Sequence, residues 1–369
     1  MVPSMALIRE DVRRIAGRSI ICGFEGPQVT AELRELVREA RPLGLILFAR
    51  NIESTAQLYE LARELKALRP RDPLLLCVDQ EGGRVARIPA PALRLPPMST
   101  LGAIDDVELT RRAGRALGRE LRVLGIDVNL APVLDVHTRP ENPVIGNRSF
   151  GSDPALVARH AVALIAGLHD AAVGACGKHF PGHGDTRTDS HLELPHLDHD
   201  TERLQRVEWP PFAHTIERGL EAVMSAHVVI DGLDPTLPAT LSRAALAPLR
   251  DRLGFRGVIL SDDIEMKALA DHHRVDEIAT LGTDAGIDVF LACRAPDVTL
   301  GLYAALVHTG EDGTVSHDAL SEREQRIVHW YGGVAQPAAS ARDLAQTIGC
   351  TEHGALEREI EQRAQARVS

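Results

Sequence analysis

The sequence has few aromatic residues, few cysteines and no long apolar run, and each shortage limits what the protein can be. Phe, Trp and Tyr make up 3% of the 369 residues, so a row of aromatic platforms for a long polysaccharide is not expected. The five cysteines are odd in number and scattered, which favours reduced thiols in the cytoplasm. Because no 18 consecutive residues are apolar, a membrane-spanning helix is not expected either.

Positive charge is also in short supply. The 52 acidic residues outnumber the 41 basic residues, and the formal net charge is −11. This balance argues against nucleic acid or an anionic membrane surface as the main partner. At the N-terminus, charged residues directly follow a short apolar run from Met5 to Ile8, a pattern unlike that of a signal peptide. We therefore expect a cytoplasmic monomer whose partner is a small molecule.

Eight short apolar segments alternate with longer amphipathic segments along the chain. The expected strands are residues 19–23, 43–48, 74–78, 127–131, 174–178, 222–227, 257–261 and 287–291. Strands that are apolar on both faces, each followed by a helical pattern, indicate a parallel sheet covered by helices. The sequence therefore predicts an α/β protein with a (β/α)8 TIM-type barrel. An open doubly wound sheet is the alternative, but no G-x-G-x-x-G motif follows the first strand.

The last part of the chain lacks any strand pattern and is rich in Ala, Arg and Glu. We expect residues 1–335 to form a single barrel domain. Residues 336–369 are expected to form a helical tail, whose role the sequence leaves open.

Polar residues cluster where five of the expected strands end, which is the position at which TIM barrels carry their active sites. The segments are VDQEGGRVARI, NLAPVLDVHTRPENPVIGNRSFG, GKHFPGHGDTRTDSH, SAHVVIDG and LSDDIEM. Each also has a structural explanation, such as a turn at Gly82 and Gly83 or a helix N-cap at Asp262 or Asp263. Five polar strand ends on one barrel face nevertheless predict a binding site.

Charged residues at these strand ends are typical of a site for a sugar-like ligand. Asp79 and Arg87 flank two glycines, so the backbone can approach a ligand closely while the carboxylate accepts hydroxyl groups. Arg148, Lys178 and His179 can add donors from neighbouring strands. The alternative is that the arginines pair with carboxylates for structural reasons.

Several histidines raise the possibility of a metal site, because imidazole is a common metal ligand. The expected first strand, however, reads SIICG and offers no ligand, and the chain has no H-E-x-x-H motif. We therefore expect neither a metal nor another cofactor. The pair Asp262 and Asp263 then becomes the expected source of a nucleophilic carboxylate.

Together these motifs resemble those of the single-domain β-N-acetylhexosaminidases of glycoside hydrolase family 3. The resemblance covers roughly residues 10–300 and is carried by GLILFARN (44–51), DQEGGRVARI (79–88), NLAPVLDV (129–136), GNRSFG (146–151), KHFPGHGDTRTDSH (178–191), MSAHVVI (224–230), PATLS (238–242) and LSDDIEM (260–266). The histidine-containing loop 178–191 is the specific element. It resembles the feature that separates this subgroup from the two-domain β-glucosidases of the family.

The resemblance implies an exo-acting retaining glycosidase that releases terminal β-linked N-acetylglucosamine through a covalent glycosyl-enzyme. Asp262 matches the nucleophile, and Asp189 and His191 match the acid/base pair. The residues that match those binding the N-acetylglucosamine ring are Asp79, Arg87, Arg148, Lys178 and His179. In this family, a cytoplasmic location implies muropeptide fragments as substrates and a role in peptidoglycan recycling.

The chemistry of imidazole suits the role that the resemblance implies for His191. Its ordinary pKa of ~6.5 lies close to cytoplasmic pH, so the ring can both give and take a proton. Asp189 would orient the ring, and the pair would change from neutral to −1 on deprotonation, as a carboxylic acid does. Asp262 is preferred to Asp263 mainly on the family pattern, and Asp263 could cap the following helix. The role of His183 stays open and could be structural.

Two other functions remain open at this point. One is phosphorolysis, because a histidine repels an incoming phosphate less than a carboxylate would. The other is a sugar-binding protein without catalysis, although both Asp262 and His191 are present.

Overall fold

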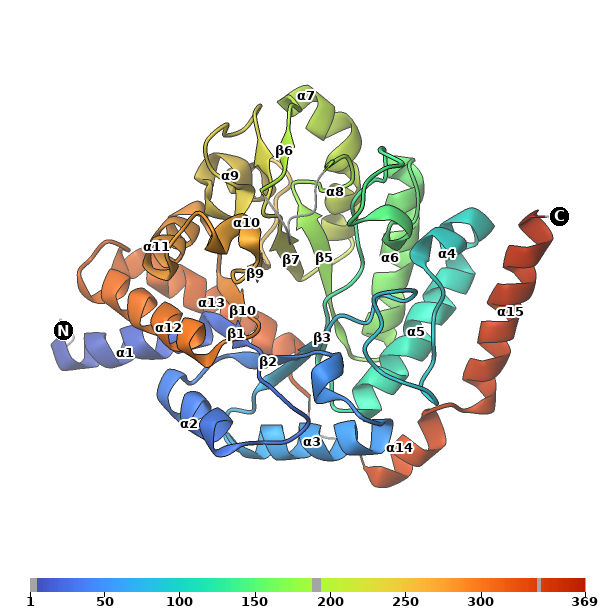
Figure 1. Cartoon of the computed structure of the whole chain (residues 1–369), viewed down its shortest axis with the longest axis horizontal. Coiled ribbons are helices and arrows are strands. Elements are labelled where there is room, and N and C mark those ends of the chain that lie inside the picture. Colours follow the sequence, from blue (N-terminus) through green and yellow to red (C-terminus); the bar gives the residue numbers. More distant parts are fainter. Residues whose placement is uncertain (1–4, 188–193, 337–339, 369) are drawn as a thin grey trace.

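Eight parallel strands form a closed barrel in the computed structural model, which describes residues 5–187, 194–336 and 340–368 (Figure 1). The barrel strands are β1 (Ile20–Cys22), β2 (Gly44–Leu47), β3 (Leu75–Val78), β4 (Val128–Asn129), β5 (Gly174–Phe180), β7 (Ala222–Ser225), β9 (Val258–Asp263) and β10 (Val289–Ala292). Their order around the barrel is β1-β10-β9-β7-β5-β4-β3-β2. The predicted (β/α)8 barrel is confirmed, and every expected strand overlaps one of these strands.

Helices surround the barrel. They are α1 (Met5–Arg18), α2 (Ala31–Ala40), α3 (Thr55–Ala67), α4 (Met98–Ile104), α5 (Val107–Val123), α6 (Pro154–Asp170), α7 (Thr201–Arg203), α8 (Pro210–Glu217), α9 (Arg243–Asp251), α10 (Lys267–Ala270), α11 (Val275–Ala285) and α12 (Pro296–Glu311). Short helical turns are η1 (Ala49–Asn51), η2 (Gly146–Arg148), η3 (Leu204–Glu208) and η4 (Ala239–Leu241), and a small parallel sheet pairs β6 (His196–Leu197) with β8 (Val229–Ile230). No helix among the described residues is long and apolar enough to cross a membrane.

The barrel is stable because its strands are apolar on both faces. Side chains of one face, among them Ile21, Cys77 and Leu260, form a core inside the barrel, while the other face packs against the helices. Burial of this kind contributes roughly 25 cal/mol per Å² of apolar surface. Because both faces of each strand are buried and apolar, polar groups can gather only at the ends of the strands.

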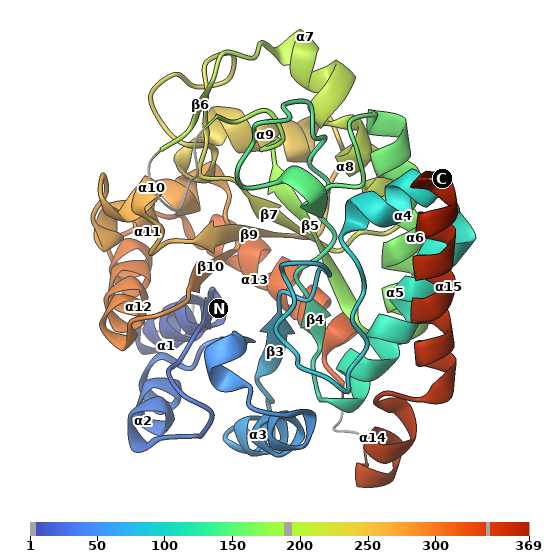
Figure 2. The ribbon, with the colours of Figure 1, turned by 45° about the vertical axis from the view of Figure 1, so that its right-hand side comes forward.

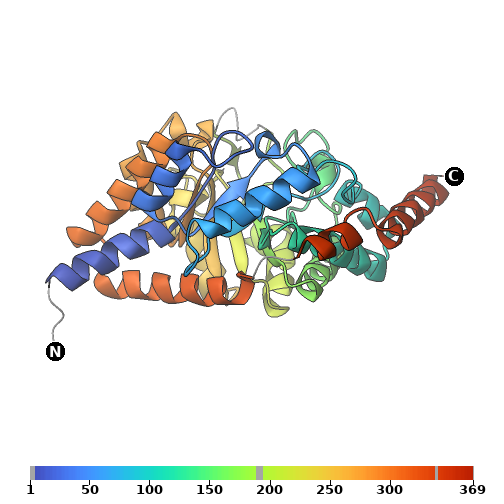
Figure 3. The ribbon, with the colours of Figure 1, turned by 90° about the horizontal axis from the view of Figure 1, so that it is seen from below.

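Helix α13 (His317–Val334) closes the barrel at the amino ends of the strands (Figure 3, orange-red). Its residues Ile327, Trp330 and Val334 belong to the same core as the interior strand residues. The hydroxyl of Tyr331 donates a hydrogen bond of 2.7 Å to the carbonyl of Pro73, two residues before β3. The opposite end of the barrel, at the carboxyl ends of the strands, is therefore the open end.

The C-terminal residues form α14 (Ala341–Thr347) and α15 (Thr351–Val368), which lie along α4 and α5 (Figure 2). Buried Glu120 of α5 connects these helices to a loop near the barrel mouth. Its carboxylate accepts the N–H groups of Leu93 at 2.7 Å and Gly349 at 3.2 Å, and lies 2.7 Å from Nδ1 of His353. The division into a barrel domain of residues 1–335 and a tail of residues 336–369 remains our proposal.

Candidate active site

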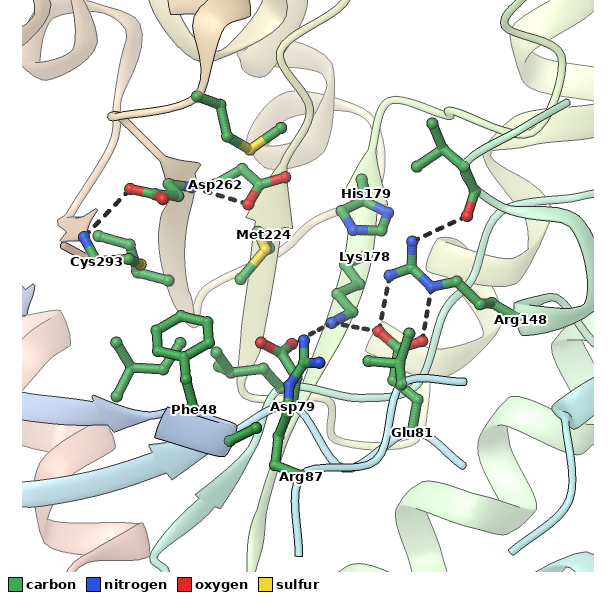
Figure 4. Close-up of a pocket in the computed structure, with 18 of the residues that line it drawn as sticks. Phe48, Asp79, Glu81, Arg87, Arg148, Lys178, His179, Met224, Asp262 and Cys293 are labelled. Carbon is green, nitrogen blue, oxygen red and sulfur yellow. Dashed lines mark hydrogen bonds and ion pairs between the residues drawn. The ribbon is translucent and has the colours of Figure 1, made fainter. Parts of the chain in front are cut away.

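A cavity of about 450 Å³ lies at the open end of the barrel (Figure 4). Six of the predicted site residues line it. They are Asp79, Arg87, Arg148, Lys178, His179 and Asp262. The predicted acid/base residues Asp189 and His191 lie outside the described residues, so their assignment stays a prediction.

The barrel geometry brings these residues together from distant parts of the chain. Asp79 directly follows β3, Lys178 and His179 stand near the end of β5, and Asp262 is the second-last residue of β9. Arg148 comes from η2, in the long segment after β4. Carboxyl ends of parallel strands share one face of a barrel, which is why residues from four of the five sequence motifs meet in a single cavity.

One wall of the cavity is a network of two carboxylates and two cations (Figure 4). Lys178 Nζ lies 2.6 Å from Asp79 Oδ1 and 2.7 Å from Glu81 Oε1. Arg148 donates two parallel hydrogen bonds to Glu81, from Nε at 2.8 Å and from Nη2 at 2.7 Å. The network is neutral as a whole, so four charged side chains can be buried together at a tolerable electrostatic cost.

Glu81 is a site residue that the sequence analysis missed. Its side chain is 2% exposed. Burial alone would raise its pKa, but the charges of Lys178 and Arg148 hold that pKa well below its ordinary value. The signal that could have found it is its place in the DQEGGRVARI motif, two residues after Asp79.

The two predicted arginines differ in their pairing. Arg148 has a structural carboxylate partner in Glu81, as the alternative interpretation of the arginines expected. Arg87 has none: its Nε is buried and no described residue accepts a hydrogen bond from it. The guanidinium of Arg87 lies 5.9 Å from the centre of the Phe48 ring. Arg87 therefore presents an unused donor beside the cavity, as expected of a group that binds a ligand.

A buried carboxylate, Asp135, orients the histidines at the start of the loop that follows β5. Its Oδ2 lies 2.8 Å from Nδ1 of His179, and its Oδ1 accepts the N–H of His183 at 2.7 Å. Nε2 of His179 is then the ring nitrogen left for a ligand. Asp135 stands in the NLAPVLDV motif, but nothing in that motif indicated a partner 44 residues away.

His183 also lines the cavity. Its Nδ1 lies 2.7 Å from Oγ1 of Thr186, and its ring is almost fully buried. Burial lowers the pKa of His183 to about 4, so this imidazole is neutral near pH 7. The contact with Thr186 lies within the loop and is compatible with a structural role for His183, which stays a prediction.

Asp262 is well suited to be an ionised group in the cavity. Its Oδ1 accepts the N–H of Asp263 at 2.8 Å. Burial alone would raise the pKa of Asp262, but the nearby His179 and His227 rings and this N–H hold it below its ordinary value. The carboxylate is therefore deprotonated across the pH range in which most enzymes work.

Asp263 has a different environment. Its Oδ1 accepts the N–H groups of Glu265 at 3.1 Å and Cys293 at 3.2 Å, so it fastens the turn after β9 to the end of β10. It does not cap α10, which begins at Lys267, because the chain makes this extra turn first. Burial raises the pKa of Asp263 to about 6, and the neighbouring Glu265 carboxylate acts in the same direction.

His227 contacts the backbone at the end of β9. Its Nδ1 lies 2.8 Å from Oγ1 of Thr240, and its Nε2 lies 3.0 Å from the carbonyl oxygen of Asp263. The PATLS motif therefore holds His227, and His227 in turn holds the backbone next to Asp262. Both ring nitrogens of His227 therefore have partners, as in a histidine with a structural role.

Groups of three or more His, Cys, Asp or Glu side chains that could hold a metal ion do not occur within the described residues. Residues 188–193 lie outside that set. The prediction that catalysis needs no metal therefore stays a prediction.

The chain is similar to proteins of known activity over most of its length. Residues 8–330 match the family model for the glycosyl hydrolase family 3 N-terminal domain. A β-hexosaminidase of Neisseria meningitidis serogroup C (strain 053442) is 40% identical over 320 residues, which cover 84% of this chain and 86% of that protein.

Two solved structures show the same similarity. A glycoside hydrolase family 3 β-N-acetylglucosaminidase from Paenibacillus sp. str. FPU-7 superimposes with a TM-score of 0.92 at 37% identity, covering 95% of this chain and 68% of that one. NagZ from Neisseria gonorrhoeae, in complex with N-trifluoroacetyl-D-glucosamine, superimposes with a TM-score of 0.77 at 34% identity, covering 94% and 98%. These similarities support an enzyme rather than a sugar-binding protein without catalysis.

Proposed function

Because the chain belongs to glycoside hydrolase family 3 and is a β-N-acetylhexosaminidase, we propose that it hydrolyses terminal β-linked N-acetylglucosamine by a retaining mechanism. In such a mechanism a carboxylate attacks the anomeric carbon, and water then hydrolyses the covalent glycosyl-enzyme. We assign the attack to Asp262. The observation that carries this assignment is the contrast at the end of β9, where Asp262 is held ionised and Asp263 is engaged by two backbone N–H groups.

The N-acetylglucosamine ring is proposed to lie between the charged network and Asp262. Asp79 and Lys178 face the cavity from one side and can accept and donate hydrogen bonds to ring hydroxyls (Figure 4). The buried Nε of Arg87 supplies a further donor. Because the charges of the network balance, it can bind a neutral sugar without a net charge of its own. Asp262 is then the carboxylate that stabilises the positive charge that develops in the transition state.

The acid/base is proposed to be His191 with Asp189, on the sequence pattern of the loop. Two observations indicate that neither His183 nor His179 is suited to be the acid/base. His183 has a pKa of about 4, so near neutral pH it has no proton to give to a leaving group. His179 is bound through Nδ1 to buried Asp135 and belongs to the sugar-binding wall. These observations support, as our proposal, that His191 from the same loop transfers the proton.

The proposed natural substrates are small muropeptide fragments handled in the cytoplasm, by a monomer, during peptidoglycan recycling. Phe48 is the one Phe, Tyr or Trp side chain among the described residues that line the cavity, which suits a single sugar better than a polymer. Arg294 lies exposed in the cavity lining, and its guanidinium has no carboxylate partner among the described residues. A cation at the rim is favourable for a leaving group that carries carboxylates.

The test of the acid/base assignment uses aryl N-acetyl-β-glucosaminides with leaving groups of graded pKa. The change His191→Ala should lower kcat/KM strongly for poor leaving groups and mildly for activated ones, because an activated aryl group departs with little protonation. Asp189→Ala should act in the same direction. His183→Ala is the matched control and should show the leaving-group dependence of the wild type.

A flat response of His191→Ala, parallel to the wild type, would show that His191 is not the acid. The same assays in phosphate buffer should release free N-acetylglucosamine. Release of the sugar 1-phosphate would instead assign phosphorolysis.

A further inference from the structure

A second cavity, of about 480 Å³, lies at the end of the barrel opposite to the active site. It is bounded by α9, by the loop before β10 and by α13, which closes the amino ends of the strands. Arg250, Asp288, Arg323 and Arg326 line it. Its volume falls within the range of roughly 300–1,000 Å³ that is usual for small-molecule sites.

Positive charge exceeds negative charge in the buried part of this cavity. The carboxylate of Asp288 is fully buried and is already shared by two arginines, with Arg250 Nη2 at 2.7 Å and Arg326 Nε at 2.9 Å. Arg323 is a third guanidinium and is 5% exposed. Among the described residues, none forms a hydrogen bond or an ion pair with the guanidinium of Arg323.

The other carboxylates that line the cavity do not compensate Arg323. Asp284 is bound to another arginine at 2.9 Å. Glu322 is 71% exposed and lies 3.9 Å from Arg326, and Asp251 is exposed. Burial accordingly lowers the pKa of Arg323 to about 10, against the weaker opposite effect of Asp288.

A second polar group in the same lining also lacks a partner. Oγ1 of Thr283, on α11, is buried, and no described residue forms a hydrogen bond with it. Buried polar atoms without partners are rare in folded proteins, because each costs roughly 1–3 kcal/mol. Thr283 Oγ1 is such an atom, and the guanidinium of Arg323, on a residue that is 5% exposed, has no hydrogen-bond or ion-pair partner among the described residues either. Both groups can donate hydrogen bonds into one cavity, which indicates a ligand that accepts hydrogen bonds and carries negative charge.

We propose that this cavity is a binding site for a small phosphate-bearing ligand, whose oxyanion is held by Arg323 and Thr283. The planar guanidinium matches the geometry of two phosphate oxygens, and a hydroxyl is a usual third donor. The cavity is larger than a bare phosphate ion needs, which favours a phosphate monoester over inorganic phosphate. The site is separate from sugar hydrolysis, since Asp262 stands at the other end of β9.

The experiment measures thermal unfolding of the full chain in a phosphate-free buffer, with inorganic phosphate or glycerol 1-phosphate added. Sodium chloride at matched ionic strength controls for screening. The wild-type Tm should rise saturably by about 2 °C or more, as it does for any ligand that binds the folded state alone. Glycerol 1-phosphate should act at lower concentration than inorganic phosphate, and the reverse order would assign the free ion as the ligand.

Two variants test the proposed donors. In phosphate-free buffer, Arg323→Met should unfold at or above the wild-type temperature, because it removes a buried charge without a partner. It should then lose the phosphate response. Thr283→Val should weaken the rise of Tm with phosphate. It is the alternative test if Arg323→Met does not fold. The matched control is Arg206→Gln, which removes an exposed arginine charge and should respond like the wild type.

Several results would overturn the proposal. These are an equal rise of Tm in Arg323→Met, an equal rise with sodium chloride, or no rise in the wild type. Kinetics separate this cavity from the active site: phosphate should leave KM for an aryl N-acetyl-β-glucosaminide unchanged. Competitive inhibition of equal strength in the wild type and in Arg323→Met would place the anion in the active site instead.

Discussion

The change Glu81→Gln tests whether the charged network is needed for catalysis. In the wild type, Glu81 and Asp79 balance the charges of Lys178 and Arg148. Glutamine keeps the shape of the side chain but removes one of the two negative charges. One carboxylate is then left with two buried cations, and Arg148 loses its two charge-assisted bonds of 2.7 and 2.8 Å.

The expected cost can be stated from these contacts. Breaking a buried ion pair by removing one partner costs about 3–5 kcal/mol. If about 2.7 kcal/mol of this is lost from transition-state binding, kcat/KM falls about 100-fold. The remainder, up to about 2 kcal/mol, should appear as a lower free energy of unfolding. Both quantities are measurable, by aryl glycoside kinetics and by urea unfolding.

The matched control is Glu25→Gln. Glu25 also pairs with an arginine of the cavity lining, Arg50, at 3.0 Å, but its side chain is 71% exposed. An exposed pair of this kind contributes less than about 1 kcal/mol, so activity should stay within about threefold of the wild type. A Glu81→Gln enzyme that stays within threefold as well would refute the role of the network.

Three further predictions concern the two aspartates of β9 and the tail. Asp262→Ala should lower kcat about 10,000-fold or more, whereas Asp263→Asn should lower it less than about tenfold; reversed effects would make Asp263 the nucleophile. Because burial raises the folded-state pKa of Asp263 to about 6, above its unfolded value of ~3.8, the wild type should lose up to about 3 kcal/mol of stability as the pH rises from 4 to 7. Asp263→Asn has no such proton to lose, so unfolding curves of the two proteins should diverge over that range, and parallel curves would contradict the raised pKa. Glu120→Ala leaves three donors unsatisfied and should lower the free energy of unfolding by about 3 kcal/mol or more. The control Glu352→Ala removes an exposed pair with Arg119 and should lower it by less than about 1 kcal/mol. Equal losses would rule out Glu120 as the connection to the tail.

The sequence by itself determined the barrel and the position of its site. Strands such as Leu75–Val78 are apolar on both faces, and this pattern is stable only in a sheet covered on both sides. Once the barrel is given, Asp79, Lys178 and Asp262 must share one face, because parallel strands all end there. The sequence carries this information locally, since it depends on short apolar runs and on the residues directly after them.

The tertiary structure alone decided which charges share a buried volume. The pairing of Glu81 with Arg148 joins residues 67 positions apart, and that of Asp135 with His179 joins residues 44 apart. The different pKa directions of the adjacent Asp262 and Asp263 have the same origin. Ionisation and pairing depend on distance, desolvation and competing partners, and these are set by how strands and helices pack rather than by their order along the chain.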